Sequence, residues 1–296
     1  MDDIAIDEEL IRSLLAEQHP DLADLELREV AGGWGNQMWR LGQELAVRMP
    51  RTSRAPSPLR VEQQWLPVLA PTLPLPVPVP VRVGEPSPRF PDTWSIARWV
   101  DGEPADSAPI TSPQAAGVLA GFLRALHAKA PEDAPANPGR GGPLVRQAFD
   151  QWLPVTASSE VAAQARRVWE DAVAAPPWQG PPVWLHADLH PANVVVSGGT
   201  LAGVLDFEEL CAGDPATDLA AAWVLLPAGT ASRFFGAYAN ADKATIRRAR
   251  GWAVLRAFVL IGIGINGEQG LPGGKPTWLP AGWSALARVL ASEVGT

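Results

Sequence analysis

The octapeptide H-A-D-L-H-P-A-N, residues 186–193, is the strongest indication of how this chain folds, together with V-L-D-F at residues 204–207. Asp188 and Asn193 are five positions apart, and Asp206 follows Asn193 by 13 positions. Two apolar runs separated by a Gly-Gly pair lie between Asn193 and Asp206, which is typical of a β-hairpin. The sequence therefore predicts a polar loop that leads into a hairpin and ends in a second carboxylate.

These three polar side chains are of the kind that a phosphoryl-transfer site requires. A carboxylate accepts the proton of the attacking hydroxyl, and oxygen ligands hold Mg²⁺ against the phosphates of the donor. The aspartate base and the metal-binding asparagine of the kinase catalytic loop have the spacing of Asp188 and Asn193. Ala187 stands where kinases have arginine, and Glu208 stands where their Asp-Phe-Gly motif has glycine. We predict Asp188 as the base, and Asn193 and Asp206 as ligands of Mg²⁺.

With these departures and with G-D-P-A-T-D-L-A at residues 213–220, the chain resembles the aminoglycoside phosphotransferase family, which also contains macrolide and other small-molecule kinases. The resemblance implies an α+β, two-lobed protein-kinase-like fold. Its antiparallel-sheet N-lobe, residues 1–100, would bind the nucleotide. Its mostly helical C-lobe, residues 101–296, would carry the catalytic loop and the acceptor-binding helices. The implied reaction moves the γ-phosphoryl group of ATP or GTP, with Mg²⁺, to a hydroxyl of a small and often cationic acceptor. An aminoglycoside-like antibiotic is the expected acceptor, and antibiotic resistance the expected role.

A glycine-rich loop in the N-lobe carries the first residues that the resemblance implies around the nucleotide. The loop G-G-W-G-N, residues 32–36, lies between two expected strands. Glycine permits close approach of the backbone, so we predict that Gly33, Gly35 and Asn36 cover the triphosphate. The alternative is an ordinary turn, because glycine-rich dipeptides often only punctuate a chain.

Arg48 lies inside an apolar strand expected at residues 44–50, where the general kinase pattern has a phosphate-binding lysine. Its guanidinium can bind phosphate oxygens with two parallel hydrogen bonds. The alternative is a solvated charge that protects a strand edge. By resemblance, Glu62 is the helix carboxylate that pairs with Arg48. The alternative for Glu62 is the polar face of a surface helix.

Eight prolines between residues 71 and 91 forbid a helix there. We interpret this stretch as a rigid connector into edge strands rather than as a polyproline ligand, because valines and leucines alternate with the prolines. A strand is expected from Trp94 to Val100, and by resemblance it forms the hinge. Its backbone would contact the nucleotide base through Ile96, Ala97, Arg98 and Trp99. We interpret Trp94 and Trp99 as packing residues rather than a base-stacking platform.

Further residues have roles that the resemblance implies in the C-lobe. His186 would brace the catalytic loop, and Asp218 would accept hydrogen bonds from the loop backbone. His190 would help to shape the acceptor side. Glu208 and Glu209 would form an acidic wall for a polyamine, or else a solvated turn. Glu268 would face the acceptor pocket.

The alternating His186, Asp188 and His190 also permit an interpretation as zinc or iron ligands of a hydrolase. Pro191 interrupts any strand there, and only His19 and His127 remain as further histidines. We therefore favour phosphoryl transfer over a metal hydrolase. The kinase-like fold is also compatible with a metabolite kinase for an amino alcohol or sugar, and with a catalytically silent nucleotide-binding protein.

Helices dominate the expected C-lobe. An amphipathic helix begins near Ser112 and ends near His127, which we interpret as a C-terminal cation or a surface group. Two more helices are expected at residues 245–265 and 281–294, joined by a turn-rich loop. The longest apolar stretch, residues 257–265, is too short to span a bilayer, so it predicts a buried helix and no membrane partner.

Composition limits the remaining possibilities. The chain has 296 residues, of which 47% are hydrophobic, and a net charge of −8. That charge argues against a nucleic-acid partner, which would require clustered Lys and Arg. An acidic surface attracts cations, and the alternative is that the acidity serves solubility alone. A single cysteine, Cys211, excludes an internal disulfide, and the start M-D-D lacks a signal peptide, so a cytoplasmic location is expected. We interpret Cys211 as core filler.

Overall fold

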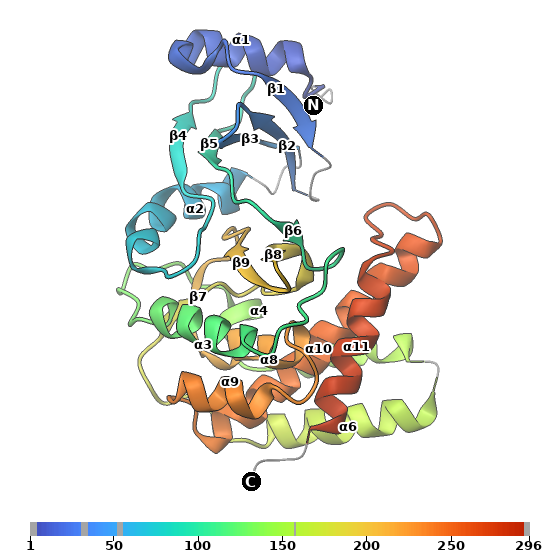
Figure 1. Ribbon diagram of the computed structural model, residues 1–296. Helices are drawn as coiled ribbons and strands as arrows, with labels where there is room; N and C mark the ends of the chain where they lie inside the picture. The colour runs from blue at the N-terminus through green and yellow to red at the C-terminus, as the bar shows by residue number, and fades with distance from the viewer. Residues whose placement is uncertain (1–4, 31–34, 52–55, 157, 293–296) are drawn as a thin grey trace. The chain divides into compact units, whose positions relative to one another are not determined.

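The computed structural model describes residues 5–30, 35–51, 56–156 and 158–292 (Figure 1). The chain forms two compact units, each described by itself below. The first unit comprises Met1–Pro71, Pro76–Asp101 and Leu205–Glu208. The second comprises Thr72–Leu75, Gly102–Val204 and Glu209–Thr296. The short segment that carries Asp206 thus belongs with the N-terminal part of the chain, although it lies far away in sequence.

The first unit is built on an antiparallel sheet of five strands in the order β1-β2-β3-β5-β4 (Figure 1). Its elements are α1 (Glu8–Gln18), η1 (Pro20–Leu22), β1 (Leu27–Val30), β2 (Asn36–Leu41), β3 (Leu45–Pro50), α2 (Pro56–Leu69), η2 (Ala70–Thr72) at its first boundary, β4 (Pro80–Gly84) and β5 (Trp94–Arg98). The antiparallel pairing brings Arg48 of β3 opposite Ser95 of β5. A phosphate-binding candidate therefore lies on a central strand.

Helix α1 and the sheet share one apolar core. The helix buries Ile11, Leu14 and Leu15, which recur at helical spacing, and the Asp7 side chain caps its N-terminus. Trp94 is fully buried in the same core, so its interpretation as a packing residue is confirmed. The core fixes the sheet, and the sheet in turn positions the polar residues of β2 and β3.

The proline-rich stretch leads into an edge strand, as predicted. Strand β4 lies at the end of the sheet order and pairs with β5. Proline is tolerated at such an edge because its missing N–H faces away from the ladder. A Cβ on Gly84 would lie 1.8 Å from the Trp94 ring, so this residue must be glycine for the edge strand to approach the core.

The second unit is mostly helical and contains two small antiparallel sheets, β6-β8-β9 and β7-β10. Its elements are β6 (Glu103–Pro104), α3 (Ala115–Leu126), α4 (Pro138–Gly141), α5 (Arg146–Trp152), η3 (Leu153–Val155), α6 (Ser159–Val173), β7 (Val183–Leu185), η4 (Pro191–Asn193), β8 (Val194–Ser197), β9 (Thr200–Val204), β10 (Cys211–Gly213), α7 (Ala216–Leu219), α8 (Ala221–Val224), α9 (Ala231–Tyr238), α10 (Lys243–Glu268) and α11 (Trp278–Ala291). Strands β8 and β9 form the predicted hairpin, and its turn residues Gly198 and Gly199 have φ of 57° and 75°. Cys211 is buried, which confirms its interpretation as core filler, and burial raises the pKa of its thiol to about 12.

Helix α10 is the central helix of the second unit, and it packs against α5, α6, α7, α8 and α11 (Figure 1). Its 26 residues are long and apolar enough to cross a membrane by length and composition alone, but 83% of its most apolar window is buried inside the unit. The prediction of a buried helix is confirmed. A Cβ on Gly264 would lie 2.4 Å from the backbone nitrogen of Leu279, so this glycine permits the close approach of α11.

Candidate active site

The predicted catalytic loop begins where strand β7 ends, and its backbone is held by Asp218 of α7. The Asp218 carboxylate accepts hydrogen bonds from the backbone N–H of His186 at 2.7 Å and of Ala187 at 2.8 Å. Ala187 has φ of 66°, a left-handed conformation that is uncommon for a residue with a side chain. Asp218 therefore makes the contact that the resemblance implied, and its supporting role in turnover stays a prediction.

The Asp218 carboxylate is buried, and His127 contacts it from the end of α3. The ring Nε2 of His127 lies 3.3 Å from Asp218, and its Nδ1 lies 2.8 Å from the hydroxyl of Tyr238. Burial acts to raise the pKa of Asp218, but His127, His186 and the Ala187 N–H together lower it. The interpretation of His127 as a surface group is wrong, since only 3% of its side chain is exposed. Sequence could not place it beside a carboxylate 91 positions away.

Asp188 lies among cationic donors of the second unit. Arg140 Nη1 donates to Asp188 Oδ1 at 2.6 Å, and Arg256 Nη1 donates to the same oxygen. The other oxygen, Oδ2, lies 3.5 Å from His190 Nε2. Burial acts to raise the pKa of Asp188, but Arg256, His190 and Arg140 hold it well below its ordinary value. The carboxylate therefore stays charged and held in one orientation.

Asn193 lies beside Asp188, as the spacing requires. Its side-chain N–H donates to the Asp188 backbone carbonyl at 3.0 Å, and the residue is buried. This bond leaves the amide oxygen of Asn193 as the ligand atom for a cation. Oxygen ligands suit Mg²⁺, which binds proteins through one or two side chains and keeps its other positions for water and phosphate. Asn193 and the carboxylate of Asp206 thus fit Mg²⁺ chemically.

Sequence reasoning missed both arginines that bind Asp188. The sequence around Arg140 indicates a loop and no role, whereas the residue lies on the short helix α4. Arg256 lies in the most apolar part of α10, and its side chain also donates to the carbonyl of Ala187. A charged residue inside an apolar helical run requires a buried partner. That signal identifies Arg256 as a candidate, although it does not name the partner.

The predicted acceptor residues have different surroundings. His190 Nδ1 accepts the Ala192 N–H at 3.3 Å, and its ring packs on Trp278 with centroids 4.6 Å apart. Glu209 accepts from Asn137 Nδ2 at 2.6 Å and lies 4.0 Å from Arg140 Nε. Glu268 is exposed at the end of α10. His190 is thus the predicted acceptor residue that contacts Asp188 directly.

A second polar cluster forms inside the first unit around Arg48. Its guanidinium hydrogen-bonds one oxygen of Glu62, and the other Glu62 oxygen accepts the Phe207 N–H at 3.0 Å. Arg48 Nη2 also lies 2.7 Å from Glu208 and 3.9 Å from Asp206. Arg48 and Glu62 are both buried, which excludes the edge-charge and surface-helix interpretations. The Asp-Phe-Glu segment is therefore held by the predicted ion pair.

Glu208 belongs to the same cluster as Arg48 and Glu62. Asn36 donates a side-chain hydrogen bond to it, and Arg48 is its cationic partner. Burial raises the pKa of Glu208 to about 7 against the attraction of Arg48, and the negative charges of Asp206 and Glu62 act in the same direction as burial. The pKa of Arg48 is raised although burial lowers it, because Glu62, Glu208 and Asp206 surround it.

The remaining nucleotide candidates are described only in part. Gly33 lies outside the described residues, and the carbonyl of Gly35 accepts the Arg51 N–H at 2.9 Å. Ile96 and Ala97 are buried in β5. The backbone N–H groups of Arg98 and Trp99 are already bonded to Val79 and Glu44, and the guanidinium of Arg40 lies 4.0 Å from the centre of the Trp99 ring. Contact of this backbone with a base stays a prediction.

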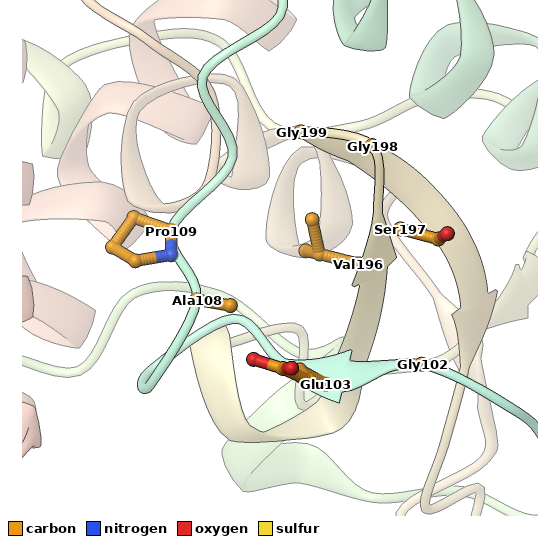
Figure 2. Close-up of a pocket in the computed structure, with 8 residues that line it drawn as sticks. All are labelled: Gly102, Glu103, Ala108, Pro109, Val196, Ser197, Gly198 and Gly199. Atoms are coloured by element: carbon orange, nitrogen blue, oxygen red, sulfur yellow. The ribbon is translucent and has the colours of Figure 1, made fainter.

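The second unit also has an open hollow of about 430 Å³ beside the β8–β9 turn (Figure 2). Figure 2 shows Ala108 and Pro109 on one side of it and the Gly198–Gly199 turn on the other. It is lined by Gly102, Glu103, Ala108, Pro109, Val196, Ser197, Gly198 and Gly199. These residues differ from the predicted site residues, so the hollow gives no support to the predicted site.

The predicted site residues therefore form two groups. The second unit brings together His186, Asp188, His190, Asn193 and Asp218. The first unit brings together Asn36, Arg48, Glu62, Asp206 and Glu208. Convergence of Asp188 and Asp206 on one ion stays a prediction. Among the residues that the structure describes, no group of three His, Cys, Asp or Glu has metal-site geometry, which gives the zinc hydrolase no support.

The sequence profile of the phosphotransferase enzyme family matches residues 26–258. The chain belongs to this family. No curated protein matches this phosphotransferase in sequence. Membership confirms the predicted enzyme class, a kinase-type enzyme that transfers phosphate to hydroxyl groups.

Solved phosphotransferases share this fold over nearly the whole chain. A mutant of aminoglycoside 2'-phosphotransferase-IIIa in complex with GDP has a TM-score of 0.70 and 18% identity, with 96% of this chain and 97% of that chain covered. The GDP and kanamycin complex of APH(2'')-IIIa has a TM-score of 0.68 and 19% identity, with 94% and 97% covered. Macrolide 2'-phosphotransferase MphH from Brachybacterium faecium has a TM-score of 0.62 and 25% identity, with 92% and 97% covered. These likenesses confirm the predicted two-lobed, kinase-like fold of this phosphotransferase and its resemblance to the aminoglycoside phosphotransferases.

Proposed function

We propose that this phosphotransferase moves the γ-phosphoryl group of ATP or GTP to a hydroxyl of an antibiotic-like small molecule. The observation that carries the proposal is the Asp188–Asn193 pair in a loop whose backbone is held by Asp218. A partly buried, oriented carboxylate beside an amide oxygen suits a reaction that depends on positioning and charge stabilisation rather than on covalent chemistry. Asp188 would orient the acceptor hydroxyl and take its proton on Oδ2, the oxygen that the arginines leave open.

Arg48 and Glu62 support the donor half of the proposal. A guanidinium held by a buried carboxylate is fixed before the nucleotide arrives, so little side-chain freedom is lost on binding. We propose that Arg48 binds phosphate oxygens and that Asn36, with Gly33 and Gly35, covers them. Asn193 and Asp206 would hold Mg²⁺, which neutralises charge on the phosphates when bound. Ile96, Ala97, Arg98 and Trp99 would supply the base-contacting backbone.

The acceptor is proposed from the relatives. Solved neighbours are named as aminoglycoside and macrolide phosphotransferases, and one is a complex with kanamycin. We therefore propose an aminoglycoside or macrolide acceptor, a role in antibiotic resistance and a cytoplasmic location, where the donor nucleotides are. His190 and Glu268 would line the acceptor side, with Glu209 next to it, whereas Glu208 is bonded within the cluster around Arg48. A metabolite kinase for an amino alcohol or sugar remains the second candidate, because it would use the same catalytic residues.

A phosphate-transfer screen tests the function. Purified protein, Mg²⁺ and either ATP or GTP are incubated with aminoglycosides, macrolides, peptide antibiotics, amino alcohols and sugars, and the phosphorylated product is identified by mass. We expect one acceptor class to gain phosphate. Asp188→Ala should lower turnover by roughly 10² to 10⁴, the usual contribution of a positioned general base. Near-wild-type turnover of this variant would refute the role of Asp188. Nucleotide binding without any transfer would favour a catalytically silent protein.

A further inference from the structure

Two guanidinium groups share one oxygen of Asp188, and they differ in how firmly they are held. Arg256 is buried in α10 and donates to Asp188 Oδ1 and to the carbonyl of Ala187. Arg140 makes a single hydrogen bond to Oδ1, and 31% of its side chain is exposed. Arg256 therefore holds the catalytic loop through two contacts from a buried position, whereas Arg140 makes one contact from a partly exposed position.

The two guanidinium groups share the single negative charge of Asp188 at one oxygen atom. The other carboxylate near Arg140 is Glu209, at 4.0 Å from its Nε, the limit of an ion pair, and Glu209 also accepts a hydrogen bond from Asn137. Like charges this close repel, and both burial and the neighbouring Arg140 lower the pKa of Arg256. The more exposed cation of such a pair is the one that moves to a new anion.

The backbone of Arg140 is fixed while its side chain reaches Asp188. Its carbonyl accepts the hydroxyl of Thr217 at 2.6 Å, and the next carbonyl, of Gly141, accepts the Asp214 N–H at 3.2 Å. A Cβ on Gly213 would lie 2.3 Å from the Gly141 oxygen, so α4 and β10 are in close backbone contact. The backbone that carries the Arg140 side chain is therefore fixed, which suits binding of a group that always arrives at the same place beside Asp188.

In the proposed reaction, the negatively charged phosphoryl group approaches Asp188 in every turnover. The bond from γ-phosphorus to the bridging oxygen breaks, a bond from phosphorus to the acceptor oxygen forms, the hydroxyl proton moves to Asp188, and nucleoside diphosphate leaves. The acceptor oxygen is hydrogen-bonded to Asp188, so the transferring phosphoryl group comes within reach of any cation on that carboxylate. Fixed donors aimed at such a group contribute more in the transition state than in the ground state.

We propose that Arg140 is a further catalytic residue, which leaves Asp188 Oδ1 to bind an oxygen of the phosphoryl group during transfer. The proposal rests on the proposed function, because it requires phosphoryl transfer at Asp188. Arg140 could instead bind an anionic group on the acceptor. The two possibilities are distinguished by the kinetic constant that the loss of Arg140 changes. Binding of the transferring group affects kcat, whereas binding of an acceptor anion affects the KM of the acceptor.

The test compares R140Q, R140K and R146Q with the wild type. Arg146 is an exposed residue of α5 in the same unit, so R146Q removes the same charge away from Asp188. The reactions are transfer to an acceptor found by the screen and hydrolysis of MgATP, in which water is the acceptor. We expect R140Q to lower kcat in both reactions by roughly 100-fold, with KM values within about threefold, R140K to recover part of the loss, and R146Q to match the wild type.

A binding measurement separates catalysis from a structural ion pair. MgADP with fluoroaluminate mimics the planar phosphoryl group, and MgADP alone does not. We expect R140Q to weaken the fluoroaluminate complex by roughly 100-fold and to leave MgADP binding unchanged. Equal weakening of both complexes, an unchanged kcat, or a raised acceptor KM alone would each overturn the proposal. If the wild type shows neither transfer nor Asp188-dependent hydrolysis, the proposed function itself has failed; if only R140Q behaves like the wild type, the proposed function stands.

Discussion

Asp218 accepts the backbone N–H of Ala187, a residue that stands in a left-handed conformation directly before Asp188. The same carboxylate accepts the neighbouring His186 N–H, so one side chain holds both peptide groups that directly precede Asp188, the predicted catalytic residue. The conformation of the loop is therefore stabilised from α7 and not by the loop sequence alone.

Replacement of Asp218 by asparagine should disturb both stability and turnover. An amide has one acceptor oxygen, so one buried N–H loses its partner, at a cost of about 1–3 kcal/mol in the free energy of unfolding. We expect kcat to fall at least tenfold as Asp188 loses its orientation, measured beside urea unfolding. The matched control is Asp242→Asn, because Asp242 also accepts a backbone N–H, of Thr245, at the start of α10. Equal effects of the two variants on kcat would contradict a supporting role for Asp218.

Arg256→Lys keeps a charge but loses the forked donor that reaches both Asp188 and Ala187. A lysine cannot make both hydrogen bonds in this geometry, so we expect kcat to fall roughly tenfold or more. Arg250→Lys is the control, since Arg250 is another buried arginine of α10 and donates to Ser292. It should lower the unfolding midpoint in urea without changing kcat. Full activity of the Arg256 variant would mean that Asp188 does not need this contact.

Glu62→Gln should affect the nucleotide rather than the acceptor. The variant leaves Arg48 with a weaker partner and a less fixed guanidinium. We expect the KM for ATP or GTP to rise roughly tenfold and the acceptor KM to stay within about twofold, measured by varying each substrate in turn. Gln63→Glu, at the neighbouring position of α2, would serve as a poor control because Gln63 bonds Thr93, Trp94 and Ser95. Glu29→Gln on β1, an exposed carboxylate of the same unit, is preferable.

Stability should depend on pH through Glu208. Burial raises its pKa to about 7 from an ordinary value of 4.5, so the folded chain keeps a proton that the unfolded chain has lost between these values. Stability from this group is present below pH 4.5 and is lost as the pH rises towards 7. Urea unfolding between about pH 4.5 and 8 should show this decrease, and Glu208→Gln should remove it. An identical pH dependence in the variant would exclude Glu208 as the cause.

Two glycine-to-alanine changes should act in opposite directions. Gly264→Ala places a methyl group against the backbone of Leu279 in α11, and we expect a loss of about 1–3 kcal/mol in the free energy of unfolding. Gly121→Ala in α3 meets nothing within 4 Å, so it should stabilise by about 0.5–1 kcal/mol through helix propensity. Thermal unfolding of both variants checks the pair. A neutral Gly264→Ala would mean that α11 can move away from α10.

The local sequence pattern was sufficient to predict features that depend on residues close together in the sequence. The hairpin after Asn193 follows from its apolar runs and its Gly-Gly pair, and the buried state of Arg48 follows from its place inside an apolar strand. The Arg48–Glu62 pair came only from the family resemblance, because a strand and a helix 14 positions apart give no other sign of contact.

Contacts between distant helices could not be predicted in the same way. His127, Arg140 and Arg256 approach Asp218 and Asp188 across 91, 48 and 68 positions. Their partners depend on how α3, α4 and α10 pack, and hydrophobic periodicity in the sequence does not predict which elements pack together. For Arg256, the sequence indicates that a lone charge in an apolar run needs a buried partner, but it does not indicate which residue that partner is. For Arg140, in a glycine-rich loop, the sequence gives no such indication.

Helix α10 connects two of the predicted parts of the site. It carries Arg256, which contacts Asp188, and it ends at Glu268, a predicted acceptor residue, beside the loop that precedes Trp278. If both predictions hold, amino-acid changes that adapt the end of this helix to a new acceptor will also act on Asp188 through the same helix. Laboratory evolution towards other acceptors should accordingly collect its mutations in the α10–α11 connection and in Trp278, and spare the middle of α10.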